Sequence, residues 1–403
     1  MKNDFFKFLL GTKLQSFVSA LYRFGFLLIF YQMNNSLFYS SLLIASTIIV
    51  SRITLILLIP YLKGRNPIKI SIVMNLLIGG VAILAILIYP LWNQKIIGFF
   101  VLAVIFSTLE EMDNSFQYAV IPNLVQKEFL FKANSLNAIF ANINLIVAPV
   151  GSYVFYLMGD LRGFLGAYGI ICFLSSGILK SIHFSFDAEN NLQKEKKNVH
   201  TFYKEWHKTI GIILNNQNIL FCIAIGVVIN LIFAGISGAV LLKMGEVSSN
   251  QVFGQTIIKI ALAGGSLVGV FGVLKLKVKE NYNKYLNISI LGLILNLVFM
   301  AFIHIEIMVY IMFFVLAVFI MFIMNATGTF LQLSTPKNEL SSIYAFRSTL
   351  YAIVVPVSHV IAGAMLQFLD KTYYFLFSVF LLLVIYLLKF LHSDKTSSLK
   401  FLL

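Results

Sequence analysis

Long apolar runs recur from one end of the chain to the other, each about long enough to cross a bilayer. A membrane-spanning helix needs about 20 such residues. Because hydrocarbon offers no partner to backbone N–H and C=O groups, each run must be a helix. We therefore expect an all-α integral membrane protein. Its twelve spans are predicted at residues 14–33, 38–60, 70–90, 96–118, 133–158, 162–183, 217–242, 250–274, 286–303, 307–330, 341–367 and 372–391.

The composition excludes a soluble protein. Hydrophobic types make up 59% of the 403 residues and charged types only 11%, and the mean hydropathy is +0.90. A soluble protein carries about 25% charged residues, so this chain has too few polar side chains to cover a surface in water. The sequence holds no phosphate-binding loop, metal-ligand cluster or nucleophile–base pair. We therefore expect no ATPase or other enzyme, and no cofactor or metal.

The net charge of +14 follows the predicted topology. With the N-terminus inside, 23 of the 30 basic residues fall in inside loops and ends, four fall outside, and three lie within spans. This distribution obeys the positive-inside rule, so it indicates a membrane protein and no nucleic-acid partner. We expect a multi-pass monomer in a bacterial cell membrane, with both termini in the cytoplasm.

The two halves of the chain resemble each other. The longest polar interval, 184–216, separates six spans from six spans. The loops before the fifth and eleventh spans each contain Pro, Lys and Glu, and each opens a helix with a proline inside it, Pro149 or Pro356. Repeated six-helix units are typical of secondary transporters. We expect an N-terminal bundle at 1–183, a cytoplasmic linker at 184–216 and a C-terminal bundle at 217–403.

Three stretches resemble the major facilitator superfamily, and within it the twelve-helix drug exporters of the macrolide-efflux and siderophore-export type. They are Arg52 followed by Pro60, the segment AVIPNLVQKEFLFKANSL at 119–136, and APVGSYVFYLMG at 148–159. The second is the most specific. The resemblance implies two six-helix bundles that rock around a central cavity to give alternating access.

The resemblance also suggests which residues control opening. In the loop PYLKGRNPIK, Arg65 and Lys69 keep the family's basic character, but the family's aspartate is missing. Pro149 and Gly151 resemble a degenerate Gly-Pro motif of antiporters, and Pro356 occupies the related place in the second half. We treat these five residues as gating candidates.

Four ionisable residues lie at one depth in the N-terminal half. Arg23, Arg52, Glu110 and Glu111 are each about 11–14 Å from the cytoplasmic end of their span, and Asp113 lies beside the glutamates. A charge in the bilayer costs about 3 kcal/mol unless it faces a partner or a cavity. We expect an arginine to pair with a glutamate. Such a pair is either purely structural, or its carboxylate carries the proton that couples transport to a gradient.

Polar residues at helical spacing mark candidate cavity walls. The resemblance places spans 1, 4, 7 and 10 around the cavity, and span 4 carries a polar residue every three or four positions. The alternative is that such stripes bind neighbouring helices through hydrogen bonds, and Lys259 could instead reach the membrane interface. The candidates are Ser107, Asn114 and Gln117 in the first half and Asn230, Lys259, Asn325 and Thr329 in the second.

These features predict a secondary active transporter that exports amphiphilic small molecules of the drug or antibiotic type, coupled to protons. The carboxylates of span 4 favour cationic or neutral substrates. One alternative is a facilitator or importer of a metabolite or peptide, since Arg23, Arg52 and Lys259 would suit an anion. Another is a receptor or immunity protein that does not transport, built on a degenerate transporter scaffold.

Overall fold

A computed structural model describes residues 3–62, 65–126, 130–157, 161–182, 199–275, 278–336 and 339–393. Within these ranges the chain forms helices and short connections, with no strand. The helices group into two compact units, Met1–Glu195 and Lys196–Leu403.

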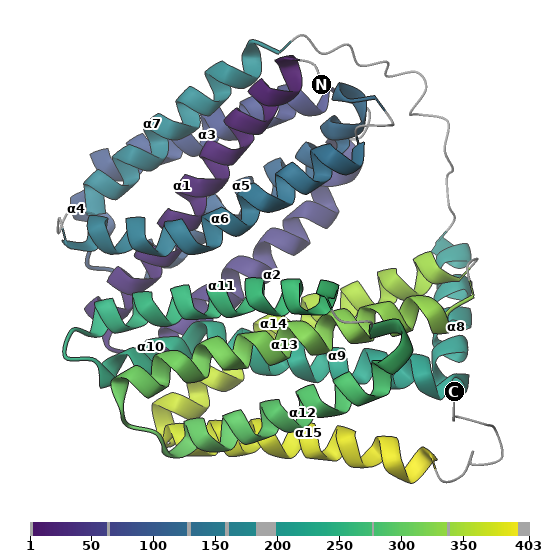
Figure 1. Cartoon of the computed structure of the whole chain (residues 1–403). Coiled ribbons are helices and arrows are strands. Elements are labelled where there is room, and N and C mark those ends of the chain that lie inside the picture. The colour runs from purple at the N-terminus through teal and green to yellow at the C-terminus, as the bar shows by residue number, and fades with distance from the viewer. Residues whose placement is uncertain are drawn as a thin grey trace. The chain divides into compact units, whose positions relative to one another are not determined.

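The first unit is built around α1. This helix packs on α6 and α7, while α3 packs on α5 and α7 and α2 packs on α5 (Figure 1). Its helices are α1 (Asn3–Asn34), α2 (Leu37–Leu62), α3 (Pro67–Leu87), α4 (Tyr89–Trp92), α5 (Ile96–Leu124), α6 (Leu130–Leu157) and α7 (Leu161–Lys180).

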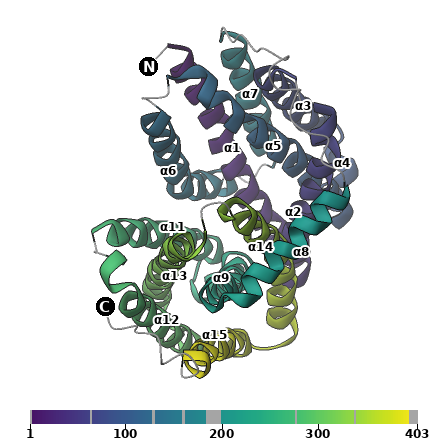
Figure 2. The same ribbon diagram turned by 90° about the vertical axis from the view of Figure 1, so that its right-hand side faces the viewer.

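The second unit is built around α9. This helix packs against α13, α14 and α15, while α13 also packs on α11 and α12 (Figure 2). A π-helical turn at Ile236–Val240 continues α9 into α10. The helices are α8 (Val199–Asn215), α9 (Gln217–Gly235), α10 (Leu241–Met244), α11 (Gln251–Lys275), α12 (Val278–Phe302), α13 (Glu306–Ser334), α14 (Leu340–Phe368) and α15 (Lys371–Ser393).

Every predicted span overlaps a long helix, and the seventh is the continuous run of α9, the π turn and α10. Among the described residues, nine helical stretches are long and apolar enough to cross a membrane, and parts of α6 and α15 form shorter apolar stretches. The remaining long helix is α5, which carries Glu110, Glu111 and Asp113. The predicted all-α membrane fold with twelve long helices is confirmed.

An aromatic cluster joins three helices of the first unit. Tyr22 of α1 stacks on Tyr168 of α7 with ring centroids 4.9 Å apart, and it meets Phe106 of α5 at 5.0 Å. All three side chains are almost completely buried. Such ring contacts contribute about 0.5–1.5 kcal/mol beyond the area they bury, so this cluster helps to hold α1, α5 and α7 together.

Small residues let α11 and α13 approach closely. A Cβ at Gly265 would overlap the carbonyl oxygen of Phe314, and one at Gly269 would lie 2.8 Å from the Met321 Cβ. Close backbone approach at small residues is a main source of helix association in membranes. The spacing of Ala261, Gly265 and Gly269 predicts this packing face, and the two glycine contacts confirm it.

The predicted linker at 184–216 needs a correction. Its second half is the helix α8, which packs on α9 and α14. Trp206 meets the Phe346 ring at 5.4 Å, Lys208 lies 2.5 Å from Glu339, and Ile213 is buried. The many polar residues suggest a loop, but Trp206, Thr209 and Ile213 recur at helical spacing and form the less exposed side of a helix. Residues 183–198 lie outside the described part of the chain.

Candidate functional site

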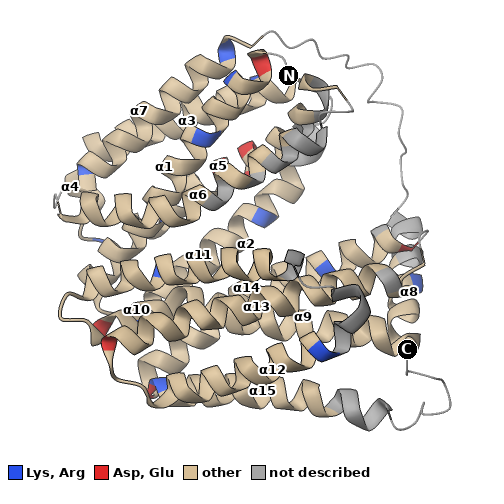
Figure 3. Cartoon of the chain, in the orientation of Figure 1, with Lys and Arg blue, Asp and Glu red and all other residues tan. Residues whose placement is uncertain are grey.

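Charged residues are sparse along the described helices (Figure 3), and α5 carries three carboxylates, on Glu110, Glu111 and Asp113. Glu110 points towards α1 and α7 and is only 3% exposed. Its Oε2 lies 3.3 Å from Nε of Arg23, whose own side chain is 59% exposed. This contact is an ion pair rather than a hydrogen bond, because Oε2 accepts no hydrogen bond in the described structure. The other oxygen, Oε1, accepts a hydrogen bond from the Tyr168 hydroxyl.

A chain of hydrogen bonds leads from α1 to this carboxylate. The Gln15 amide donates to Ser19 Oγ at 3.2 Å, and Ser19 donates to the Tyr168 hydroxyl at 3.4 Å. Tyr168 in turn donates to Glu110. All four side chains are buried. Because every donor in the chain points towards Glu110, the network stabilises negative charge on that carboxylate.

The neighbouring glutamate forms a second ion pair, with a different helix. Arg52 of α2 places Nη1 2.9 Å from Oε1 of Glu111, and the two side chains are 53% and 28% exposed. Successive residues of a helix point about 100° apart, which is why Glu110 meets α1 and Glu111 meets α2. The charges that the sequence places at one depth therefore form two separate pairs.

Asp113 is held differently from both glutamates. It is fully buried and accepts hydrogen bonds from Ser71 Oγ at 2.5 Å, Gln117 Nε2 at 2.8 Å and Asn75 Nδ2 at 3.2 Å. All three donors are neutral, and Asp113 is in no ion pair among the described residues. An ionised carboxylate without a cation is costly away from water. Among the described residues, Asp113 is therefore a buried carboxylate held by neutral hydrogen-bond donors alone.

The predicted cavity residues of α5 have mixed roles. Ser107, Asn114 and Gln117 are each half-buried. The Gln117 amide donates a hydrogen bond to the Asp113 carboxylate, one helical turn away, so it helps to hold that carboxylate in place. All three residues remain candidates for contact with a substrate.

In the second unit, two predicted asparagines bond within their own helices. Asn230 of α9 donates to the Gly226 carbonyl at 2.8 Å, and Asn325 of α13 donates to the Met321 carbonyl at 2.7 Å. Lys259 of α11 and Thr329 of α13 are half-buried.

The gating candidates have well-defined positions. Arg65 and Lys69 are exposed around the start of α3, where Asn66 caps the helix by accepting from the Ile68 and Lys69 amides. Two candidates lie in α6: Pro149 is buried in the middle of the helix, and a Cβ at Gly151 would lie 2.7 Å from Leu21 Cδ1 of α1. The equivalent proline, Pro356, is buried inside α14.

Several residues of the site escaped the sequence reasoning. Tyr168 and Ser19 lie in apolar runs where one hydroxyl carries no signal about its partner. Ser71 and Asn75 are four residues apart in the third span, so that spacing was an available sign of a polar face. A cavity also lies at the ends of α1 and α6, and its lining includes none of the predicted site residues.

The family is decided by a comparison with family models. The model of the Major Facilitator Superfamily matches residues 8–359, which is most of the chain. The chain belongs to the major facilitator superfamily. This confirms the resemblance at the level of the superfamily. The major facilitator chain is therefore a multi-pass membrane transporter of small molecules, and not an enzyme.

Solved structures of transporters share this fold. The nucleoside transporter NupG is 11% identical, with a TM-score of 0.67 over 95% of this chain and 97% of that one. A bacterial homologue of the iron transporter ferroportin, in its inward-facing state, is 13% identical, with a TM-score of 0.69 over 96% and 98%. The xylose transporter XylE from E. coli is 16% identical, with a TM-score of 0.61 over 95% of each chain. Comparison with curated protein sequences gave no match. At such low identity the likeness supports the fold and not the substrate.

Proposed function

We propose that this transporter exports amphiphilic small molecules, as the macrolide-efflux and siderophore-export type does, and that protons drive it. The observation that carries the proposal is the Arg23–Glu110 pair. Its carboxylate is buried and has one oxygen, Oε2, with no hydrogen-bond donor in the described structure, while its arginine is more than half exposed.

The pair provides a way to exchange a proton for a cation. A buried carboxylate needs either a cation or a proton to offset its charge. Arg23 is the more exposed partner, so it is the one able to leave. A proton on Oε2 would then replace it, while Tyr168 keeps its hydrogen bond to Oε1. Protonation of Glu110 would thus release Arg23 and change how α1 and α5 are held together.

Asp113 supplies a second protonation site in the same helix. Its three neutral donors hold the carboxylate without a cation, so a proton can bind and leave with no arginine movement. Glu111, paired with Arg52 closer to solvent, completes the proposed coupling group. The five residues Arg23, Arg52, Glu110, Glu111 and Asp113 carry this role in the proposal.

The substrate would be neutral or cationic, because an anion would be repelled by the carboxylates of α5. We assign its contacts to the polar residues that the family arrangement places around a central cavity. They are Ser107, Asn114, Gln117, Asn230, Lys259, Asn325 and Thr329.

Alternating access would follow from rocking of the bundle 1–183 against the bundle 217–403, to which α8 is added because it packs on α9 and α14. Arg65 and Lys69 would control the cytoplasmic opening, while Pro149, Gly151 and Pro356 would let α6 and α14 bend. We propose a monomer in the cell membrane with both termini in the cytoplasm.

An importer of an anionic metabolite or peptide is the second candidate. It is favoured by the exposure of Arg23 and Arg52, which are 59% and 53% exposed although they lie within helices. An anionic substrate could then compete with the glutamates for the two guanidinium groups.

Accumulation of the fluorescent amphiphile Hoechst 33342 in bacteria that lack their own drug exporters tests the proposal. Cells that produce the protein should accumulate less dye than cells without it, and a protonophore should remove the difference. Glu110→Gln should abolish export, whereas Glu246→Gln, which removes an exposed pair with Lys243, should not. Equal accumulation for a panel of cationic and neutral dyes, with the protein present in the membrane, would contradict export. Faster uptake of an anionic dye would favour the importer.

A further inference from the structure

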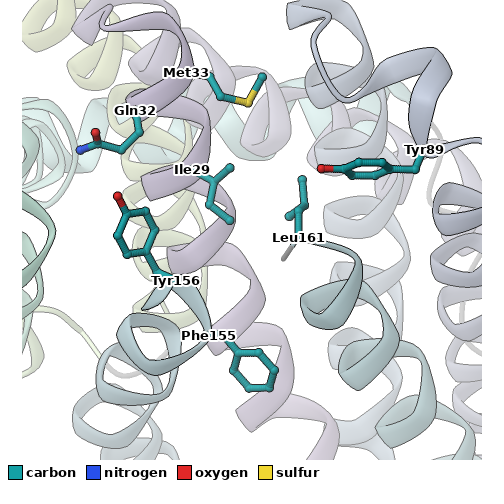
Figure 4. Close-up of a pocket in the computed structure, with 7 residues that line it drawn as sticks. All are labelled: Ile29, Gln32, Met33, Tyr89, Phe155, Tyr156 and Leu161. Carbon is teal, nitrogen blue, oxygen red and sulfur yellow. The ribbon is translucent and has the colours of Figure 1, made fainter. Parts of the chain in front are cut away.

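A cavity of about 330 Å³ lies in the first unit, where α1 and α6 end and α7 begins (Figure 4). Its walls come from α1, α4, α6 and the first residue of α7. Ile29, the wall residue nearest to Arg23 in the sequence, is about 9 Å further along α1. The cavity is therefore a separate feature from the ion pair of Arg23 and Glu110.

The lining is aromatic and uncharged. Tyr89 of α4 and Phe155 and Tyr156 of α6 contribute three rings, and Met33 of α1 contributes a thioether. Figure 4 shows the Tyr156 hydroxyl pointing towards Gln32 at one edge of this apolar surface, whereas the Tyr89 hydroxyl points towards Ile29 and Leu161. Rings and a flexible thioether suit a flat apolar body, while a few polar groups would fix its orientation.

Charge near the cavity selects against cations. No lining residue is ionisable apart from the tyrosine hydroxyls, and the guanidinium of Arg162 lies over the Tyr89 ring, 5.1 Å from its centroid. A cationic ligand stacked on that ring would meet the arginine charge. An uncharged ligand would keep the ring contacts without this repulsion.

The walls are anchored in the core of the unit. Phe155 packs on Phe164 with centroids 4.8 Å apart. Tyr89 meets Trp92 at 5.4 Å, and Trp92 donates its indole N–H to the Ala85 carbonyl at 2.8 Å. Because these rings are already held, the cavity needs little reorganisation to accept a ligand. Its volume is at the lower end of the range for small-molecule sites, which limits the ligand to one or two fused rings.

We propose that this cavity is a binding site for an uncharged, flat amphiphile, with one or two fused rings and a hydroxyl group. It is distinct from the proposed substrate cavity, and it does not depend on the direction or the coupling of transport. The rings would stack against Tyr89, Phe155 and Tyr156, and the hydroxyl would bond at the edge formed by Gln32 and Tyr156.

Trp92 offers a direct reporter, because the chain has only two tryptophans. In a Trp206→Phe variant, Trp92 is the single tryptophan, one ring away from the cavity. The purified variant in lipid nanodiscs is titrated with 6-bromo-2-naphthol, whose bromine quenches tryptophan at short range. We expect saturable quenching. The Trp92→Phe variant reports from Trp206 in the second unit and should show only the weak, linear quenching of probe dissolved in the membrane.

Substitutions of the wall in the Trp206→Phe background locate the site. Tyr156→Leu and Phe155→Ala should each weaken binding about tenfold through loss of a ring contact. Tyr156→Phe keeps the ring and tests the hydroxyl alone, with a smaller loss. Tyr373→Leu, at an exposed tyrosine of α15, is the matched control and should bind as the parent does. The unquenched Trp92 emission spectrum shows that each variant keeps its fold.

Two further probes decide the ligand class. The 6-bromo-2-naphthyl trimethylammonium ion should bind at least tenfold more weakly than the naphthol, and equal binding would overturn the requirement for an uncharged ligand. Nanodiscs made with 9,10-dibromostearoyl lipid test for an acyl chain in the cavity. Strong quenching by this lipid that the naphthol fails to relieve would overturn the proposal, as would naphthol quenching that Tyr156→Leu and Phe155→Ala leave unchanged.

Discussion

Replacing Arg23 with leucine should destabilise the protein, because it leaves the buried Glu110 carboxylate without its cation. At 3.3 Å and an effective dielectric constant of about 20, the attraction between the two charges is about 5 kcal/mol. Since Arg23 is 59% exposed, solvent screening removes most of this. We expect a net coupling of about 1–2 kcal/mol, below the cost of breaking a fully buried pair.

A double-mutant cycle measures this coupling. The free energies of unfolding of the parent, Arg23→Leu, Glu110→Gln and the double variant are compared in dodecyl maltoside. Arg23→Leu should cost more than Glu110→Gln, because only the first leaves a charge buried and unpaired.

The Arg52–Glu111 pair is the matched control. Both of its side chains are more exposed than Glu110, at 53% and 28%, so its coupling should stay below about 1 kcal/mol although the distance is shorter. A coupling for Arg23–Glu110 that is indistinguishable from zero, or equal to that of the control pair, would refute the reasoning from burial.

Three other outcomes follow from the described contacts. Asp113→Leu should lower the free energy of unfolding by about 1–3 kcal/mol, since it leaves Ser71, Asn75 and Gln117 without their acceptor; an unchanged denaturation midpoint would contradict this. Gly265→Ala should lower the melting temperature by forcing α11 from the Phe314 carbonyl, whereas Gly264→Ala, whose Cβ would lie 3.4 Å from the Phe314 ring, should have little effect. Hydrogen bonds from the Thr372 hydroxyl and amide lower the pKa of Asp370 below 3.8. The start of α15 should therefore lose protection from amide exchange only as the pH falls below about 4 and Asp370 becomes protonated. Asp370→Asn should remove that pH dependence.

The helices could be predicted from the sequence because a segment that crosses lipid has to satisfy its backbone hydrogen bonds within itself. A run of apolar residues long enough to span the bilayer leaves no other structure available, and the twelve long helices follow. The helix α8, inside the predicted linker 184–216, could not be predicted in the same way, because charged and polar residues dominate the composition of that segment. Its buried Ile213 and its contact between Trp206 and Phe346 belong to a periodicity that composition does not record.

The sequence predicts how deep in the membrane the charged residues of the candidate site lie, but not which way their side chains point. A rise of 1.5 Å per residue is enough to place Arg23 and Glu110 at one level. Which arginine meets which glutamate depends on how each helix is rotated about its axis, and that is decided by packing such as the stacking of Tyr22 on Tyr168. The aromatic cavity near Tyr156 depends on where α1 and α6 end and where α4 and α7 begin. No single stretch of the sequence contains that information.

Proton movement in proteoliposomes tests the central claim most directly. The purified protein is reconstituted with a pH-sensitive dye inside the vesicles, and a neutral or cationic amphiphile is added outside at zero membrane potential. If export is coupled to protons, the substrate should drive a proton flux in the opposite direction, and Glu110→Gln should abolish this flux while the protein stays folded and still binds the substrate. Substrate transport without proton movement, or an unchanged proton flux in Glu110→Gln, would contradict this coupling.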